Sequence, residues 1–466
     1  MAVHTRHPVA APPTAPAREK TSHLLLRGWC IYVLAAVLAG TSWIMAFGTT
    51  VAAVGGMIAT AVTVALWAIV RPAVQWQRLP WFAVAYVVLA AASVIWSQWP
   101  ATTIATVGLL LVTTFHAFFV AAVLTWRELV RAVASALKWI LGLSLVFELW
   151  VSLIWRGTIL PGFVRPDGPV DDPIVLWSRD NLLDGGRIQG IFGNANALAY
   201  VALLGLIVFA VRIASRAPRR GLLFGWMVIA GYLFLRAGSA TATLAAALVV
   251  VVLITVLLMR TTRRAGERTR FYIAYALVGV GGLATVWFAR DAIFQTLGRS
   301  SDLTGRESIW AAVWERAAEH PVLGWGFATP WNPADPAFDG WIIDHGESVI
   351  QAHNMWLDVF LQLGAIGVVV MATAYLAFVW RSWFFAVDRP RWDLDADRPY
   401  SPVTLVPTLT GAVLLVQGFA ESTPLLMWGW LFLVMFAFKI KQAPLVGRGP
   451  AEELLTGEQG DRLRER

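Results

Sequence analysis

The sequence predicts an all-α polytopic membrane protein, and both its composition and its apolar patterning support this fold class. Of the 466 residues, 58% are hydrophobic and only 14% are charged, whereas about 25% of residues are charged in an average soluble domain. The apolar residues form long runs, and about 20 of them span a bilayer as a helix. The one cysteine, Cys30, excludes an internal disulfide. A soluble globular domain, a disordered chain and a disulfide scaffold are therefore excluded.

Twelve apolar runs are candidates for membrane-spanning helices. The Pro- and Ala-rich residues 1–27 and the polar residues 442–466 are predicted to be flexible tails, which leaves 28–441 as one transmembrane domain. The first run is long enough to remain as an anchor instead of a cleaved signal. The expected spans are 28–47, 51–70, 81–97, 102–124, 130–155, 193–211, 221–236, 238–259, 271–289, 354–380, 402–421 and 423–438.

The distribution of basic residues predicts the orientation of these spans. An even number of spans places both tails on one side of the membrane. If that side is the cytoplasm, most of the 37 Lys and Arg residues fall in cytoplasmic tails and loops, in agreement with the positive-inside rule. We therefore expect both termini in the cytoplasm and two long loops, about 156–192 and 290–353, outside.

These two extracytoplasmic loops are the expected location of the chemistry, since long loops are commonly functional. They contain nearly half of the 29 acidic residues, and the second contains a helix near 306–320. The net charge of +8 does not indicate a nucleic-acid partner, because the basic residues are scattered over short loops. The sequence has no zinc spacing and no Walker lysine, so we expect no cofactor and no metal.

Arginines and small polar residues stand where the loops meet the helices. The first loop ends in a segment that starts at Arg187 and includes Asn194 and Asn196, Arg236 lies at the outer end of its helix, and Arg306 opens the helix of the second loop. Guanidinium groups keep their charge and present forked donors, so arginines that converge on one cavity can bind a diphosphate. Such a clamp could replace a divalent metal in stabilising a departing pyrophosphate.

Four other residues complete the candidate site. His353 stands at the outer mouth of a predicted span, where a histidine can transfer protons near neutral pH, and Asn354 could hold its ring or bind substrate hydroxyls. Trp310 could stack on a sugar ring. Glu421 lies near the outer end of an apolar run, where a charge is costly and therefore a functional candidate. The competing interpretations are a capping or interfacial role for His353, a membrane-surface anchor for Arg236, a structural ion pair for Glu421 and folding for the aromatic residues.

The motifs, taken in order, resemble the O-antigen ligase and Wzy-type polymerase superfamily. The sequence contains R-x-x-G-x-F-x-N-x-N, then G-R-x-x-x-W, then H-P-x-x-G-x-G, then H-N-x-x-L, and the resemblance is sharp over about 187–200 and 304–367. The resemblance implies a GT-C-type glycosyltransferase with a large extracytoplasmic loop that carries short helices. It would act in the bacterial plasma membrane and transfer a glycan, without metal and with inversion, from an undecaprenyl or decaprenyl diphosphate carrier to an acceptor hydroxyl.

By motif position, the resemblance implies that His353 matches the essential histidine of the family, and that Arg187 and Arg306 match its diphosphate-binding arginines. A third family arginine follows a serine at a helix mouth, whereas here Arg236 precedes Ser239, so Arg236 is a displaced match. The implied partners are the lipid-linked glycan donor, a glycan or lipid acceptor and membrane lipids. The motifs do not distinguish a ligase from a polymerase, nor do they predict the sugar, the linkage or the oligomeric state.

A transporter or flippase that binds the same lipid without catalysis is the alternative. Twelve helices suit many transporters, but such a protein would need broken helices and a site at the membrane midplane. Here the polar candidates gather at the predicted outer rim. A sensor or scaffold would not need the paired arginine and histidine motifs.

Overall fold

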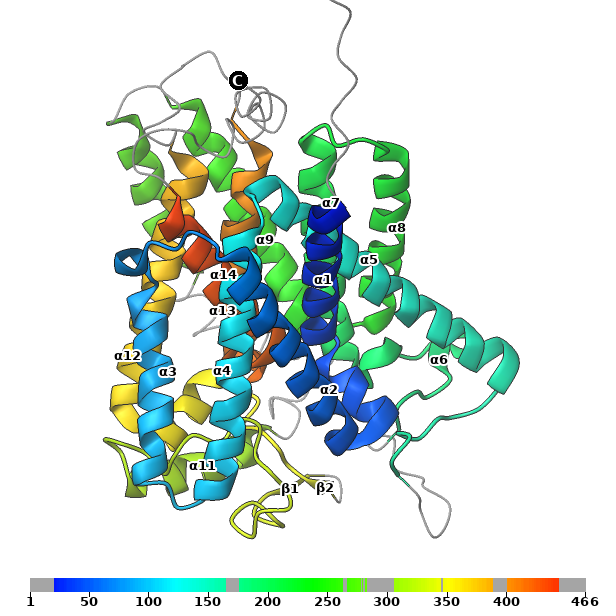
Figure 1. Cartoon of the computed structure of the whole chain (residues 1–466), viewed down its shortest axis with the longest axis vertical. Helices are drawn as coiled ribbons and strands as arrows, with labels where there is room; N and C mark the ends of the chain where they lie inside the picture. Colours follow the sequence, from blue (N-terminus) through cyan, green and yellow to red (C-terminus); the bar gives the residue numbers. More distant parts are fainter. Residues whose placement is uncertain are drawn as a thin grey trace, which may run out of the picture.

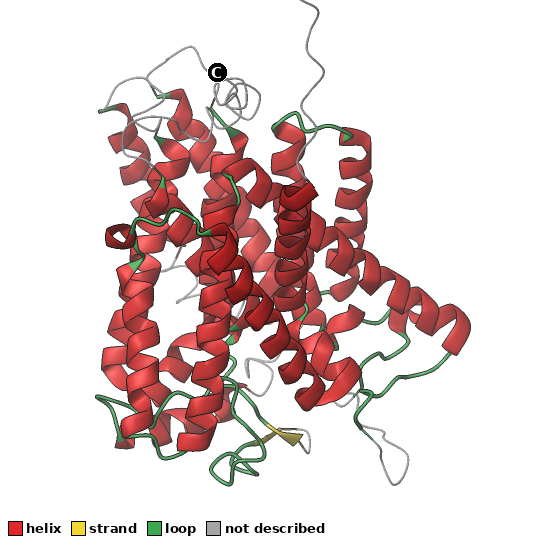
Figure 2. Ribbon diagram, in the orientation of Figure 1, coloured by secondary structure: helices red, strands yellow, loops and turns green. Residues whose placement is uncertain are grey.

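The protein is a helical bundle in the computed structural model, with one short β pairing at its lower end (Figures 1 and 2). Nine helices among the described residues are long and apolar enough to cross a membrane. The described residues are 21–164, 176–262, 266–277, 279, 281–282, 306–344, 347–388 and 400–443. The nine helices are α1 (Thr21–Leu38), α2 (Gly40–Val70), α4 (Pro100–Val123), α5 (Trp126–Trp150), α7 (Ala195–Ala214), α8 (Arg220–Ala237), α9 (Ala240–Thr261), α12 (Met355–Val387) and α13 (Leu405–Ala420).

Four shorter helices and a β pairing complete the described elements that bear on the site. These are α3 (Trp81–Ala92), α6 (Asn181–Asp184), α11 (Arg306–Glu319), α14 (Met427–Gln442), and the antiparallel strands β1 (Ile343–Asp344) and β2 (Glu347–Ser348).

The prediction of a multi-pass helical membrane protein is confirmed, and the described residues contain nine full-length candidates, whereas the sequence predicted about twelve over the whole chain. Two expected spans, 81–97 and 423–438, correspond to the shorter helices α3 and α14. The expected span 271–289 lies partly outside the described residues, as do both tails and parts of both long loops.

The core of the bundle is formed by the last two helices. Residues 428–438 of α14 are all buried, and α13 is buried along most of its length. A helix that is apolar on all sides can be surrounded completely by other helices. Accordingly α14 packs against α4, and α13 packs against α9 and α12. The C-terminal end of α13 therefore lies among other helices.

Helix α12 is broken near its start, where the sequence predicted one continuous span over 354–380. Gly364 has φ 61° and ψ −162°, so the helix consists of a short segment, 355–363, and a long segment, 365–387. A break frees backbone groups that must find new partners inside a membrane protein. Here the tract 320–326 supplies them, since Ala365 N–H donates to the carbonyl of Pro321 at 2.8 Å.

The H-P-x-x-G-x-G tract, residues 320–326, also forms hydrogen bonds with the part of α12 that precedes the break. The N–H groups of Trp325 and Gly326 donate to the carbonyls of Leu361 and Gln362, at 3.0 and 2.9 Å. Gly324 has φ 68°, and a Cβ on it would lie 2.4 Å from the carbonyl carbon of Gln362. Gly324 is therefore required because two backbone segments cross in direct contact.

Helix α11 is fixed against this crossing by an arginine inside an aromatic cage. The guanidinium carbon of Arg316 lies 4.5 Å from the ring centre of Trp341, 5.1 Å from that of Trp99 and 5.3 Å from that of Trp325. Cations are attracted to the faces of aromatic rings, and more strongly where water is excluded. This cage anchors the C-terminal half of α11 and so fixes the direction of its N-terminus.

We expect Gly364→Ala to destabilise the protein by about 2–3 kcal/mol, because its Cβ would lie 2.3 Å from the carbonyl carbon of Val322 and its φ is positive. Thermal unfolding in detergent measures the effect. Gly55→Ala is the matched control, because this glycine lies in α2 with open space around it and alanine favours the helix. Equal melting temperatures for the two variants would contradict the close backbone contact between residues 320–326 and α12 at Gly364.

Candidate active site

A cluster of polar side chains is organised by Glu421, the residue that follows α13. Its side chain is only 6% exposed, and its carboxylate accepts hydrogen bonds from three other segments. Oε1 accepts from Nδ2 of Asn196 at 3.1 Å and from Nη2 of Arg306 at 3.2 Å. Oε2 accepts from Nδ1 of His353 at 3.0 Å and from Nε2 of Gln351 at 3.3 Å. We call these five residues the Glu421 cluster.

Arg187 is connected to the cluster through Asn196. Its Nη2 donates to Oδ1 of Asn196 at 2.7 Å, and its Nε donates to the carbonyl of Ala237 at 2.8 Å. The Arg187 side chain itself is exposed. The structure thus brings together the predicted residues Arg187, Arg306 and His353, with Asn196 and Glu421 between them.

Helix starts carry most of these groups. Arg306 is the first residue of α11, Asn196 is the second of α7, and His353 stands two residues before α12. The N-terminus of a helix carries unpaired N–H groups and a partial positive charge, so it favours an anion. The cluster, together with Arg187 bound to Asn196, therefore brings two arginines to three helix starts.

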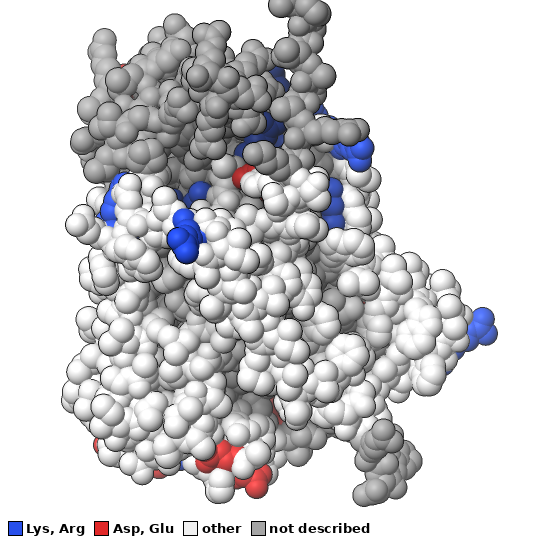
Figure 3. All heavy atoms as spheres, in the orientation of Figure 1, with Lys and Arg blue, Asp and Glu red and all other residues white. Residues whose placement is uncertain are grey.

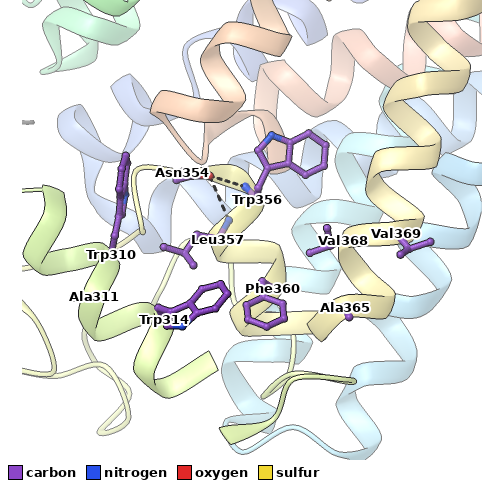
Figure 4. A pocket seen from close by; sticks show the side chains of 10 residues that line it. All are labelled: Trp310, Ala311, Trp314, Asn354, Trp356, Leu357, Phe360, Ala365, Val368 and Val369. Carbon is purple, nitrogen blue, oxygen red and sulfur yellow. Dashed lines mark hydrogen bonds between the residues drawn. The ribbon is translucent and has the colours of Figure 1, made fainter. Parts of the chain in front are cut away.

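Asn194 and Asn354 have the same structural role at two of these starts. Oδ1 of Asn194 accepts from the N–H groups of Asn196 and Ala197, at 2.9 and 3.1 Å, and so caps α7. Oδ1 of Asn354 accepts from the first N–H groups of α12 at 3.0 and 3.3 Å (Figure 4). Their oxygens are thus used in helix capping, which fixes where the neighbouring Asn196 and His353 lie.

The backbone at His353 is held in an unusual conformation. Its φ is 50°, which a residue other than glycine adopts rarely and keeps only when its surroundings enforce it. The preceding residue provides that support, since Ala352 N–H donates to the buried carboxylate of Asp358 at 3.0 Å, and Nε1 of Trp310 donates to the Ala352 carbonyl at 2.9 Å. Asp358 also accepts from the Ser422 hydroxyl, next to Glu421.

Two residues that the sequence predicted to contact sugar or phosphate form hydrogen bonds to the protein backbone. The indole N–H of Trp310 is used in holding the His353 segment. Nη2 of Arg236 donates to the carbonyls of Asn181 and Leu182, at 2.7 and 2.9 Å, so its guanidinium holds the α6 segment and not the cluster. The sequence motifs gave no signal for Gln351 and Ser422, whose roles depend on contacts with residues distant in the chain.

The electrostatics of the cluster keep Glu421 charged. Burial by itself raises the pKa of this carboxyl, but the hydrogen bond from His353, the charge of Arg306 and the amide of Asn196 outweigh it and leave the pKa below its usual value. A carboxylate that accepts from Nδ1–H fixes the histidine tautomer, and we assign the free lone pair to Nε2 on that basis. Among the described residues, Nε2 has no hydrogen-bond partner.

An apolar groove of about 740 Å³ lies beside the cluster, between α11 and α12 (Figure 4). Nine of its ten lining residues are apolar or aromatic, and the tenth is Asn354. Within the described parts of the chain, no three His, Cys, Asp or Glu side chains gather as metal ligands would.

We expect Glu421→Gln to cost about 3 kcal/mol of stability at pH 7, because the partly exposed Arg306 loses its buried carboxylate partner. Since the folded-state pKa of Glu421 is lowered, its ionisation stabilises the protein fully above the ordinary glutamate pKa of about 4.3 and is lost as the pH falls through the folded-state pKa. The difference in melting temperature between wild type and variant should therefore be constant from about pH 6 to 8 and shrink in acid. Glu307→Gln, at an exposed site on α11, is the control. A difference that does not change with pH would contradict the charged state.

Comparisons with known proteins agree with the motifs. The O-antigen ligase family matches residues 225–372, which include Arg306 and His353. The exopolysaccharide production protein ExoQ of Rhizobium meliloti (strain 1021) is 26% identical over 249 residues, which are 51% of this chain and 55% of that protein. The chain thus spans about half the length of this relative. The resemblance found in the sequence is confirmed: residues 225–372 of this multi-pass membrane protein match the O-antigen ligase family, and the chain is distantly similar to an exopolysaccharide production protein.

Proposed function

We propose that the protein transfers or polymerises a glycan from a polyprenyl diphosphate carrier onto an acceptor hydroxyl, as a GT-C-type ligase or polymerase of cell-surface polysaccharide. The O-antigen ligase match and the similarity to an exopolysaccharide production protein support polysaccharide synthesis. The observation that carries the proposal is the Glu421 cluster. In it a histidine with an available Nε2 and an arginine share one buried carboxylate, and a second arginine is one hydrogen bond away.

In this mechanism His353 acts as the general base. Its Nε2 accepts the proton of the acceptor hydroxyl while the oxygen attacks the anomeric carbon of the donor. The bond between that carbon and the diphosphate oxygen breaks, and its electron pair stays on the diphosphate. A direct displacement of this kind inverts the anomeric centre.

Arg187 and Arg306 bind the diphosphate and stabilise the charge that builds on it as it leaves. Guanidinium groups form charge-assisted, often paired hydrogen bonds to phosphate oxygens. The starts of α7 and α11 add the partial positive charge of a helix N-terminus. These groups are fixed before the reaction, so little reorganisation is needed in the transition state.

Glu421 acts through His353 as a positioning residue. Both of its oxygens already accept hydrogen bonds from protein donors, which leaves it little capacity for a sugar hydroxyl. A carboxylate on Nδ1 orients the ring, fixes its tautomer and stabilises the imidazolium that forms, in the manner of a catalytic triad. The substrate-binding role expected from the sequence is thereby revised to one of orientation.

The distribution of charge supports an orientation with the cluster outside the cytoplasm of a bacterial plasma membrane. On the face shown in Figure 3, an uncharged belt separates basic side chains, most of them in the upper half, from acidic ones near β1 and β2 at the lower end. Basic loops favour the cytoplasmic side.

A broken helix near the site is also a feature expected of a transporter. The break at Gly364, however, is filled by the backbone of 320–326, so its freed groups are already paired within the protein. This contact favours the catalytic proposal over a flippase.

We expect His353→Ala to reduce the turnover of glycan transfer by about 100- to 10,000-fold while leaving donor binding nearly unchanged, because only the general base is lost. The assay uses purified protein with a lipid diphosphate glycan and measures transfer and donor affinity separately. The control is His23→Ala, which removes a histidine that also contacts a glutamate, Glu128, at 2.6 Å but lies at the start of α1. If the His353→Ala variant transfers glycan as fast as the wild type, His353 is not the general base.

We expect Arg306→Lys and Arg187→Lys each to raise the KM for the donor about 10- to 100-fold, because lysine keeps the charge but loses the forked donors. Steady-state kinetics with varied donor concentration measure the effect. Arg156→Lys is the control, because Arg156 is exposed and its Nε donates to the carbonyl of Leu153. An unchanged KM in both variants would contradict the proposal that Arg306 and Arg187 bind the diphosphate.

The length of the products decides between the two activities. If the acceptor is another lipid-linked repeat, the purified protein produces a ladder of glycans. If the acceptor is a lipid core or a wall polymer, it produces a single block transfer.

A further inference from the structure

Helix α5 carries a buried glutamate in its last turn, Glu148, which lies outside the Glu421 cluster. This residue is only 1% exposed. A buried carboxylate is costly unless it accepts hydrogen bonds, so its donors indicate its role. Oε1 accepts from the N–H groups of Gln189 and Gly190, at 3.0 and 2.6 Å, and Oε2 accepts from the Ser178 hydroxyl at 3.4 Å. Glu148 is therefore bound to the backbone two and three residues after Arg187.

The backbone segment 189–191 fits closely against α5. Ser144 lies one turn before Glu148, and residues four apart lie on the same face of a helix. The Ser144 hydroxyl accepts from the N–H of Ile191 at 3.4 Å. Gly190 has φ 56°, and a Cβ on it would lie 2.9 Å from the Cβ of Ser144. This face of α5 therefore determines where the segment lies.

The other side of Arg187 is held by the end of α8 and by α6. The N–H of Ile188 donates to the carbonyl of Arg236 at 3.2 Å. Nε of Arg187 donates to the carbonyl of Ala237, the last residue of α8. Nδ2 of Asn181 donates to the carbonyl of Arg187 at 3.0 Å, while the guanidinium of Arg236 holds the carbonyl of Asn181 itself. Arg187 thus lies between two supports, and Glu148 provides the one on α5.

We propose that Glu148 is a positioning residue for Arg187, and the inference rests on the proposed function. Glu148 is too buried to contact a substrate, and its oxygens accept from protein donors. It holds the backbone from which the exposed side chain of Arg187 extends to Asn196. A displacement of this backbone would move the guanidinium away from the diphosphate, and a misplacement of about 1 Å can reduce activity about 100-fold. A structural role alone would lower stability without changing the affinity for the donor.

Two conservative substitutions separate the reach of the side chain from its charge. Glu148→Asp keeps the charge but withdraws the carboxylate from the two N–H groups by one methylene group. Glu148→Gln keeps the length, its Oε1 can accept from both N–H groups, and its amide can donate to the Ser178 hydroxyl. In steady-state kinetics with a lipid diphosphate glycan, we expect the donor KM to rise about ten-fold in Glu148→Asp and less than about three-fold in Glu148→Gln. The acceptor KM should stay nearly unchanged in both, because Arg187 binds the donor.

A double-mutant cycle tests whether Glu148 acts through Arg187. In the Arg187→Lys background, Glu148→Asp should change the donor KM less than about two-fold, whereas independent effects would multiply. The matched control is Glu128→Asp, which makes the same change to a buried glutamate at the opposite end of α5, where the carboxylate accepts from the N–H of Thr125 at 2.9 Å. This control should lower the melting temperature but leave the donor KM unchanged.

A second variant guards against misfolding of Glu148→Asp. Ser144→Val removes a hydrogen-bond acceptor and adds bulk where Gly190 contacts α5. It should also raise the donor KM about ten-fold in the wild-type background and not in the Arg187→Lys background.

Three results would overturn the positioning role: an unchanged donor KM in Glu148→Asp, an equal rise in Glu148→Asp and Glu148→Gln, or a rise of the same size in both backgrounds. If Arg187→Lys alone leaves the donor KM unchanged, the diphosphate role of Arg187 fails instead. If the wild-type protein transfers no glycan, the proposed function fails. The failures are therefore distinguishable.

Discussion

The buried carboxylate of Glu421 is the constraint on which the arrangement of the site depends. A charge that is removed from water is costly unless opposite charges and hydrogen bonds compensate it. Glu421 meets this requirement with Arg306 and His353 as ionic or polar partners and with two amides. The same contacts bring the start of α7, the start of α11 and the approach to α12 to one point.

A second buried carboxylate, that of Asp358, stabilises the backbone around this point. It accepts from Ala352 N–H, from the Ser422 hydroxyl and from the amide of Gln362. Because Ala352 precedes His353 and Ser422 follows Glu421, one side chain fixes both partners of the histidine–glutamate pair. The positive φ of His353 is maintained by these contacts.

The sequence predicted the helices well where a long apolar run stands between polar ends, as at 193–211 and 238–259, which became α7 and α9. It did not predict the break at Gly364, because glycine is common in membrane helices and the apolar run continues through it. Motif order predicted that Arg187, Arg306 and His353 belong together. It could not assign the roles of Glu421 and Asp358, since their partners are side chains distant in the chain, and periodicity carries no information on such pairs.

The position of Glu421 in the chain has a consequence for biosynthesis. Its partners Asn196, Arg306 and His353 precede it by 225, 115 and 68 residues. During translation Asn196, Arg306 and His353 are synthesised first. They lack the carboxylate of Glu421 until α13 has been inserted. The Glu421 cluster is therefore completed only when nearly the whole bundle has been assembled, so a nascent chain that stalls earlier lacks it.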